Sequence, residues 1–248
     1  YRDYVINAFN ADKPYNEFLI EQIAGDELVD YSNPDAIDAN IIEKLVATGF
    51  LRMAPDGTSA NPVNRVEDRI EVIGDELQIL AGGVMGLTME CARCHDHKYD
   101  PISQLDFYRL RAFFDPAFRF TKNKVASLPD GNDTLAVSHL MVRGDFRRVG
   151  DTVEASFPRI TNSHDAVSKV AKNRSNLRTQ LAVWLTNPEN ALGMRTIVNR
   201  LWQYHLGEGL SESPSDFGVM GDAPDHDQLL DWLATEFPRR RFSFKNMH

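Results

Sequence analysis

Apolar residues recur at helical spacing over most of this chain. The clearest helix is predicted over residues 66–80, because five apolar side chains fall on one face and acidic residues occupy the others. The five are Val66, Ile70, Ile73, Leu77 and Leu80. The glycine pair Gly82-Gly83 predicts where this helix ends.

Two further helices in the first half carry start signals. Asn33 followed by Pro34 predicts a helix that continues to Gly49, because asparagine caps helices and proline suits the first helical position. Ser103 and Asp106 have the spacing of a capping box, and they predict a helix that continues toward Phe113.

The helical spacing of apolar residues is lost after residue 118 and returns after residue 174. Residues 119–174 have few apolar periodicities, and short strands are predicted only at 136–142 and 153–157. Helical periodicity returns at 177–185, 194–205 and 224–238. We therefore predict a mainly α fold: two small helical domains, residues 1–118 and 175–248, joined by a loop-rich segment, 119–174, with a little β.

Composition narrows the class of protein. The chain has 248 residues, of which 42% are hydrophobic and 25% charged, as in ordinary globular proteins. It has no run of eighteen apolar residues, so this fragment has no predicted membrane span. A net charge of −9 argues against nucleic acid as the main partner. The chain begins without methionine in amphipathic sequence, and we expect a piece of a longer protein.

Both cysteines lie in one short stretch, Cys91-Ala92-Arg93-Cys94-His95, which spells C-x-x-C-H. This string is the attachment sequence of a c-type haem: two thiols form thioethers to the vinyl groups, and the histidine supplies one axial nitrogen to iron. Arg93 is a candidate partner for a haem propionate, because a guanidinium matches a carboxylate. The sequence therefore predicts covalent haem c held by Cys91, Cys94 and His95.

Three other interpretations stay open. The cysteines could bind zinc together with His95, His97 or distant histidines, although structural zinc sites normally have a second cysteine pair. They could form a redox disulfide, although the thioredoxin strand–turn–helix context is missing. The third interpretation is coincidence.

The second axial ligand decides what such a haem does. Methionine there favours a carrier of higher potential, histidine favours a lower potential, and an open position allows chemistry on a small ligand. His97 lies too near His95 in the chain to reach the far face of the haem. The candidates for this distal position are Met53, His139, His164, Met194, His205 and His226.

The residues also resemble a known family. The run from Cys91 through His95-Asp96-His97 to Asp100-Pro101-Ile102 resembles the signature of a cytochrome-like domain of Planctomycetes, the domain of unknown function 1549. The stretches 1–6, 10–15 and Gly25-Asp26-Glu27-Leu28 are similar to the same domain. The stretches 198–203, 215–218 and 229–234 resemble its companion, the domain of unknown function 1553.

This resemblance implies a protein that is periplasmic or otherwise exported, often with another cytochrome domain upstream and with more companion sequence downstream. It implies no activity. We expect a c-type haem protein that transfers electrons between an upstream cytochrome domain and a redox partner protein. The alternatives are a haem or metal enzyme with an open iron position, and a structural zinc module.

Overall fold

The computed structural model describes residues 1–53, 66–116, 137–161 and 176–248. Within these ranges the protein is mainly α-helical with one two-stranded antiparallel sheet, which confirms the predicted fold class. The α-helices are α1 (Arg2–Asn10), α2 (Tyr15–Ala24), α3 (Ala39–Ala47), α4 (Val66–Leu80), α5 (Gln104–Arg111), α6 (Leu177–Leu185), α7 (Ala191–Leu206), α8 (Asp227–Arg239) and α9 (Phe244–Met247). The strands are β1 (Ser138–Met141) and β2 (Val149–Val153).

The helix α4 has the predicted bounds, but the glycine pair does not end the helical path. A π-helical turn, Ala81–Met85, continues α4, and the path ends at Gly86 with φ +62°. Val84 and Met85 are buried in the core, so continuing the turn keeps their side chains away from water. The left-handed backbone at Gly86 then stops it, since only glycine adopts that conformation without strain.

The helix predicted from Asn33 to Gly49 is three elements: the 3₁₀ turn Pro34–Ala36, α3, and the 3₁₀ turn Thr48–Arg52, in which Gly49 lies instead of ending the helix. The Asn33 side chain accepts from the Asp35 N–H, at 3.1 Å, but it caps only the 3₁₀ turn Pro34–Ala36. Asp38 then caps α3 by accepting the Ile41 N–H at 2.8 Å. A second capping residue four positions after the first pair therefore restarts the helix.

The structure moves two further predicted boundaries. The second strand is Val149–Val153 rather than 153–157, because Phe157 is buried and stacks on Phe113 and Trp184 instead of extending the sheet. The helix α8 begins at Asp227, three residues after Pro224, and it contains Pro238 in its last turn. The predicted capping box is confirmed: Ser103 and Asp106 bond reciprocally at the start of α5.

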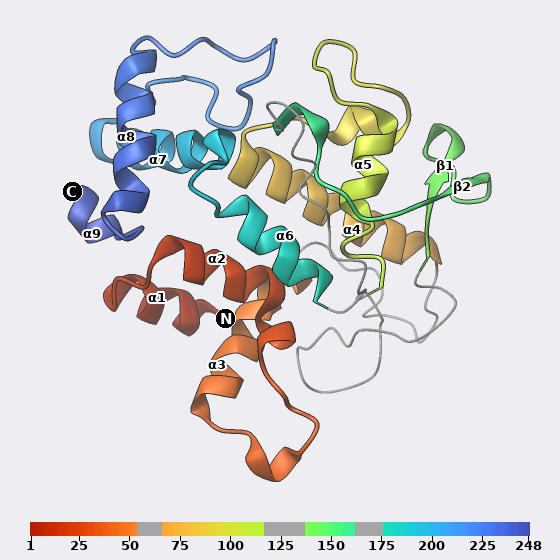
Figure 1. Ribbon diagram of the computed structural model, residues 1–248, viewed down its shortest axis with the longest axis horizontal. Coiled ribbons are helices and arrows are strands. Elements are labelled where there is room, and N and C mark those ends of the chain that lie inside the picture. The colour runs from red at the N-terminus through yellow and green to blue at the C-terminus, as the bar shows by residue number, and fades with distance from the viewer. Residues whose placement is uncertain (54–65, 117–136, 162–175) are drawn as a thin grey trace.

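One hydrophobic cluster joins the described parts of the chain. It contains Ile23 of α2 and Leu77 of α4 together with Leu181 of α6, Met194 of α7 and Phe237 of α8. Figure 1 shows α6 crossing the molecule beside α2, and α7 beside α8. Helix α7 also packs on the turn 81–85. The two regions predicted as helical domains thus share a core, while their boundaries stay a prediction.

Candidate functional site

The C-x-x-C-H sequence forms one short helical turn at the protein surface. A 3₁₀ turn, Glu90–Arg93, is followed by two hydrogen bonds to the carbonyl of Cys91, from the Cys94 N–H at 3.2 Å and the His95 N–H at 3.4 Å. Cys91 and Cys94 are free thiols, and both they and His95 are exposed.

The His95 ring is held by its own loop. Its Nδ1 lies 2.7 Å from the backbone oxygen of Asp96, an acceptor, so this nitrogen carries the proton and donates. The Nε2 atom is then the ring nitrogen with a free lone pair. Metal-binding histidines are usually oriented in this way, with the second nitrogen bonded to a carbonyl or carboxylate. Two free thiols and a histidine with an available Nε2, all on one exposed turn, fit the attachment of a c-type haem.

Cys94 lies against a tight turn that follows β1. A Cβ added to Gly144 would lie 2.8 Å from the Cys94 sulfur, so this position requires a residue without a side chain. Gly144 also has φ +73°, in the left-handed region that glycine favours. The sequence pattern did not single out Gly144, because the residue that this glycine contacts, Cys94, lies fifty positions earlier in the chain.

Helix α5 ties the motif to β1. The Arg93 carbonyl accepts from Gln104 Nε2 at 3.0 Å and from the Tyr108 hydroxyl at 3.1 Å. The same two groups reach the Met141 carbonyl, at 3.1 Å and 3.5 Å. The motif turn is therefore held by hydrogen bonds from the buried Tyr108 and from Gln104.

The Arg93 side chain pairs with the protein rather than pointing freely toward solvent. Its guanidinium forms hydrogen bonds to both carboxylate oxygens of Glu71 on α4, one of them at 2.9 Å. These bonds lower the pKa of the Glu71 carboxyl. Arg93 thus anchors the motif to α4, and its predicted contact with a propionate stays a prediction.

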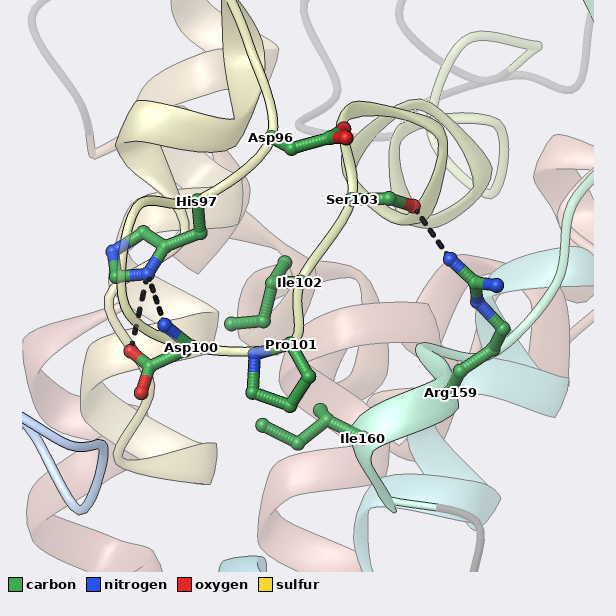
Figure 2. Close-up of a pocket in the computed structure, with 8 residues that line it drawn as sticks. All are labelled: Asp96, His97, Asp100, Pro101, Ile102, Ser103, Arg159 and Ile160. Carbon is green, nitrogen blue, oxygen red and sulfur yellow. Dashed lines mark hydrogen bonds and ion pairs between the residues drawn. The ribbon is translucent and has the colours of Figure 1, made fainter.

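A pocket of about 520 Å³ begins at the residue after His95. Its lining residues are Asp96, His97, Asp100, Pro101, Ile102, Ser103, Arg159 and Ile160. Figure 2 shows Asp96 and Arg159 on the same side of this loop, with the His97 ring pointing away from Arg159. Asp96 also accepts the Gln104 N–H at 2.7 Å, at the start of α5. The pocket therefore combines an apolar floor with charged groups of both signs.

His97 serves the loop rather than standing free beside His95. Its Nδ1 accepts the Asp100 N–H at 2.9 Å and lies 3.3 Å from Asp100 Oδ2 (Figure 2). Its backbone N–H donates to the Ile102 carbonyl at 2.8 Å. The hydrogen bonds of His97 to Asp100 and Ile102 therefore fold residues 95–102 into a closed loop.

The predicted distal ligands are spread over the fold. Met53 is an exposed residue after the 3₁₀ turn Thr48–Arg52, and Met194 is buried in the core. The Nδ1 of His205 lies 2.6 Å from the Leu201 carbonyl, and its ring lies against His248. His226 is exposed at the start of α8.

His139 and His164 complete this set. His139 is on β1, and its Nδ1 lies 3.3 Å from the Gly150 oxygen. Among the described candidates, His139 alone belongs to the strand that α5 ties to the motif. His164 lies outside the described residues.

A zinc site requires several converging donors. In residues 1–53, 66–116, 137–161 and 176–248, no three His, Cys, Asp or Glu side chains lie close enough together to hold a metal ion. The two thiols and the imidazole therefore lie on one turn without converging on a common point, and the described part of the chain gives the zinc alternative no cluster.

The structure defines a mainly helical protein with an exposed C-x-x-C-H turn. Residues 1–118 match the family model PSCyt2, a protein of unknown function (DUF1549), and residues 177–248 match PSD1, a protein of unknown function (DUF1553). Residues 1–118 therefore belong to the first of these two domain families and residues 177–248 to the second. No curated protein and no solved structure matches it. No helix in the described ranges has the length and apolar character needed to span a bilayer.

Proposed function

We propose that this chain carries a covalently attached c-type haem and transfers electrons outside the cytoplasm. The observation that supports it is the turn on which Cys91 and Cys94 are free and exposed while His95 keeps its Nε2 lone pair. Cys91 and Cys94 would each add an S–H across one vinyl C=C, so no atom is lost. His95 would hold the iron through Nε2.

When bound, the haem supplies a one-electron couple between two iron oxidation states. The chain's own residues orient the turn. The Asp96 carbonyl holds the His95 tautomer, and the Arg93–Glu71 pair fastens the turn to α4. The proposed partner is a redox protein or an upstream cytochrome domain, and attachment of this kind places the protein in the periplasm or another exported compartment.

A pyridine haemochrome spectrum tests the attachment. The chain would be exported to the periplasm of a host with c-type maturation machinery, beside the control Cys91→Ser/Cys94→Ser. We expect a c-type α-band that survives denaturation in the parent chain and is absent from the control. A folded parent chain without haem would contradict the proposal, and zinc analysis of that material would test the structural alternative.

The axial role of His95 has a matched control in His97. We expect His95→Ala to change the iron spin state or to lose haem, because it removes the nitrogen with the free lone pair. His97→Ala should keep the haem and the spin state of its iron, with only the smaller shift expected of a loosened loop, since His97 bonds within that loop. Equal spectra in both variants would contradict the assignment of His95.

The pocket beside the motif favours a second candidate, a haem enzyme with an open iron position. It has the size of a site for a small substrate, and it begins at Asp96. Absorption and electron paramagnetic resonance spectra separate the two candidates. Six-coordinate low-spin iron favours electron transfer, whereas high-spin iron that binds added cyanide or peroxide favours catalysis.

A further inference from the structure

One short segment of the C-terminal region contacts both flanks of the C-x-x-C-H turn. The Phe217 N–H donates to the Gly86 carbonyl at 2.7 Å, five residues before Cys91. The Val219 N–H donates to Asp100 Oδ1 at 2.8 Å, five residues after His95. Residues 217–219, which we call the bracket, thus hold the two ends of the segment that carries the motif.

The bracket approaches closely because glycines lie at both contacts. A Cβ added to Gly86 would lie 2.4 Å from the Phe217 ring, and one added to Gly218 would lie 2.5 Å from Asp100 Oδ2. Such distances are too short for any real side chain. The backbone hydrogen bonds at both ends therefore depend on the absence of two side chains.

Asp100 passes the position of the bracket to the motif. Its carboxylate is buried, and its N–H donates to the His97 ring at 2.9 Å. The His97 backbone in turn bonds to Ile102. The loop that begins at His95 is therefore closed at Asp100, whose backbone N–H bonds to the His97 ring while its carboxylate contacts the bracket.

The chain just before the bracket is itself anchored to the turn 81–85 through Arg200. Arg200 of α7 donates to the Ser215 hydroxyl at 2.8 Å and to the Gly82 carbonyl at 3.2 Å. Asp216 accepts the Gly218 N–H at 2.9 Å. The segment is consequently fixed before it reaches the motif, so it can impose a position on the loop.

We propose that the bracket, residues 217–219, positions the C-x-x-C-H turn through Gly86 and Asp100, so that the redox site is a joint product of the two family regions. Asp100, Phe217 and Gly218 are positioning residues in this view, since they act on the turn through the backbone of its flanks. The effect of this positioning on the reduction potential rests on the proposed haem function. The positioning itself is a property of the chain without haem.

Backbone hydrogen exchange in the full chain, made without haem, tests the positioning. Gly218→Ala introduces a Cβ against Asp100, whereas the control Gly83→Ala introduces one that meets nothing within 4 Å. We expect amides in residues 94–102 to exchange about tenfold faster in Gly218→Ala and to keep the parent rate in Gly83→Ala. Helix α1 should exchange at the parent rate in both variants.

Two results would overturn the proposal. The first is an unchanged exchange rate in residues 94–102 of Gly218→Ala. The second is an equal increase over the whole chain, because the contact would then only hold the fold together. If Gly218→Ala fails to fold, Asp100→Ala provides the same comparison, with Asp100→Asn as the conservative variant that still accepts the Val219 N–H.

A second measurement uses the haem-loaded chain. We expect Asp100→Ala to shift the reduction potential and the axial-ligand spectrum, and Asp100→Asn to restore the parent spectrum. If no variant, including the parent, takes up haem, the proposed function fails while the exchange experiment still decides the positioning. If haem is bound and Asp100→Ala leaves potential and spectrum unchanged, the bracket has no role in the redox site.

Discussion

Among the contacts that join the N-terminal region to the C-terminal region, two are built from different chemistry. The first is ionic: Arg178 is fully buried and forms a bidentate pair with Asp26, at 2.7 Å and 2.8 Å. Glu27 accepts the N–H groups of Arg178 and Thr179 at the start of α6, where a negative charge is favourable. The second contact is the bracket, where backbone N–H groups and glycines meet the flanks of the motif.

This difference separates stability from positioning. A buried charge left without its partner costs several kcal/mol, so loss of the Arg178 contact should destabilise the fold as a whole. A hydrogen bond from a backbone amide contributes about 1 kcal/mol, so the bracket can be weakened while the protein stays folded. The contact of Asp26 and Glu27 with the start of α6 therefore stabilises the fold, and the bracket, residues 217–219, sets the geometry of the surface turn.

Loss of Arg178 should have the largest effect. We expect Arg178→Ala to lower the free energy of unfolding by about 3–5 kcal/mol, because Asp26 would remain buried without its guanidinium. Denaturant unfolding of the haem-free chain measures it. The control is Arg195→Ala, whose partner Asp231 is exposed and whose loss should cost less than about 1 kcal/mol. Equal costs for the two variants would break the comparison.

Glu76 on α4 shows what burial without a partner does. Its carboxylate oxygens have no hydrogen-bond partner among the described residues, and burial, with a smaller effect of Asp75, raises its pKa to about 8. The folded protein therefore keeps this proton at pH values where the unfolded chain, with a pKa near 4.5, has released it. The contribution of Glu76 to the free energy of unfolding should therefore be most favourable below pH 4.5. It should fall as the pH rises toward 8.

Glu76→Gln should remove that pH dependence. We expect the variant to be more stable than the parent by a few kcal/mol at pH 8 and to differ little at pH 4.5. Unfolding curves over pH 4.5–8 measure the effect, with Glu17→Gln on α2 as the exposed control. Parallel pH profiles for the parent and Glu76→Gln would show that the carboxyl is not the source.

The smallest effect is expected at the cap of α5, beside the motif. Ser103 accepts the Asp106 N–H at 3.1 Å and also accepts from Arg159. We expect Ser103→Ala to cost about 1 kcal/mol of stability, the usual value of a lost N-cap. In hydrogen exchange the increase should be confined to the first turn of α5. An increase that extends to Cys94 and His95 would mean that α5, rather than the bracket, positions the turn.

The sequence predicted those features whose causes are local. The bounds of α4 follow from its apolar face, and the start of α5 follows from a capping box four residues long. The C-x-x-C-H turn, which was not predicted, also has local causes, because its hydrogen bonds join neighbours three and four positions apart. The helix predicted from Asn33 was wrong in its extent because two capping residues compete there, and local patterns do not rank them.

The sequence did not predict the roles of the family stretches. Asp26 and Glu27 were recognised by resemblance alone, and only the fold places them against Arg178, more than 150 residues later in the chain. Ser215 to Gly218 likewise had no assigned role until the bracket appeared. The distal ligand stays undecided for the same reason: each candidate is a single residue whose distance from His95 depends on how the elements pack.

The sequence by itself determined the chemistry that this protein can offer, two thiols and an imidazole on one turn, because bonds between close neighbours fix that arrangement. The tertiary structure alone decided what holds the turn in place. Val219 and Asp100 are 119 residues apart, and Gly86 accepts Phe217 only because the core brings α7 against the end of α4. Such contacts depend on the packing of whole helices, and no short pattern of residues encodes them.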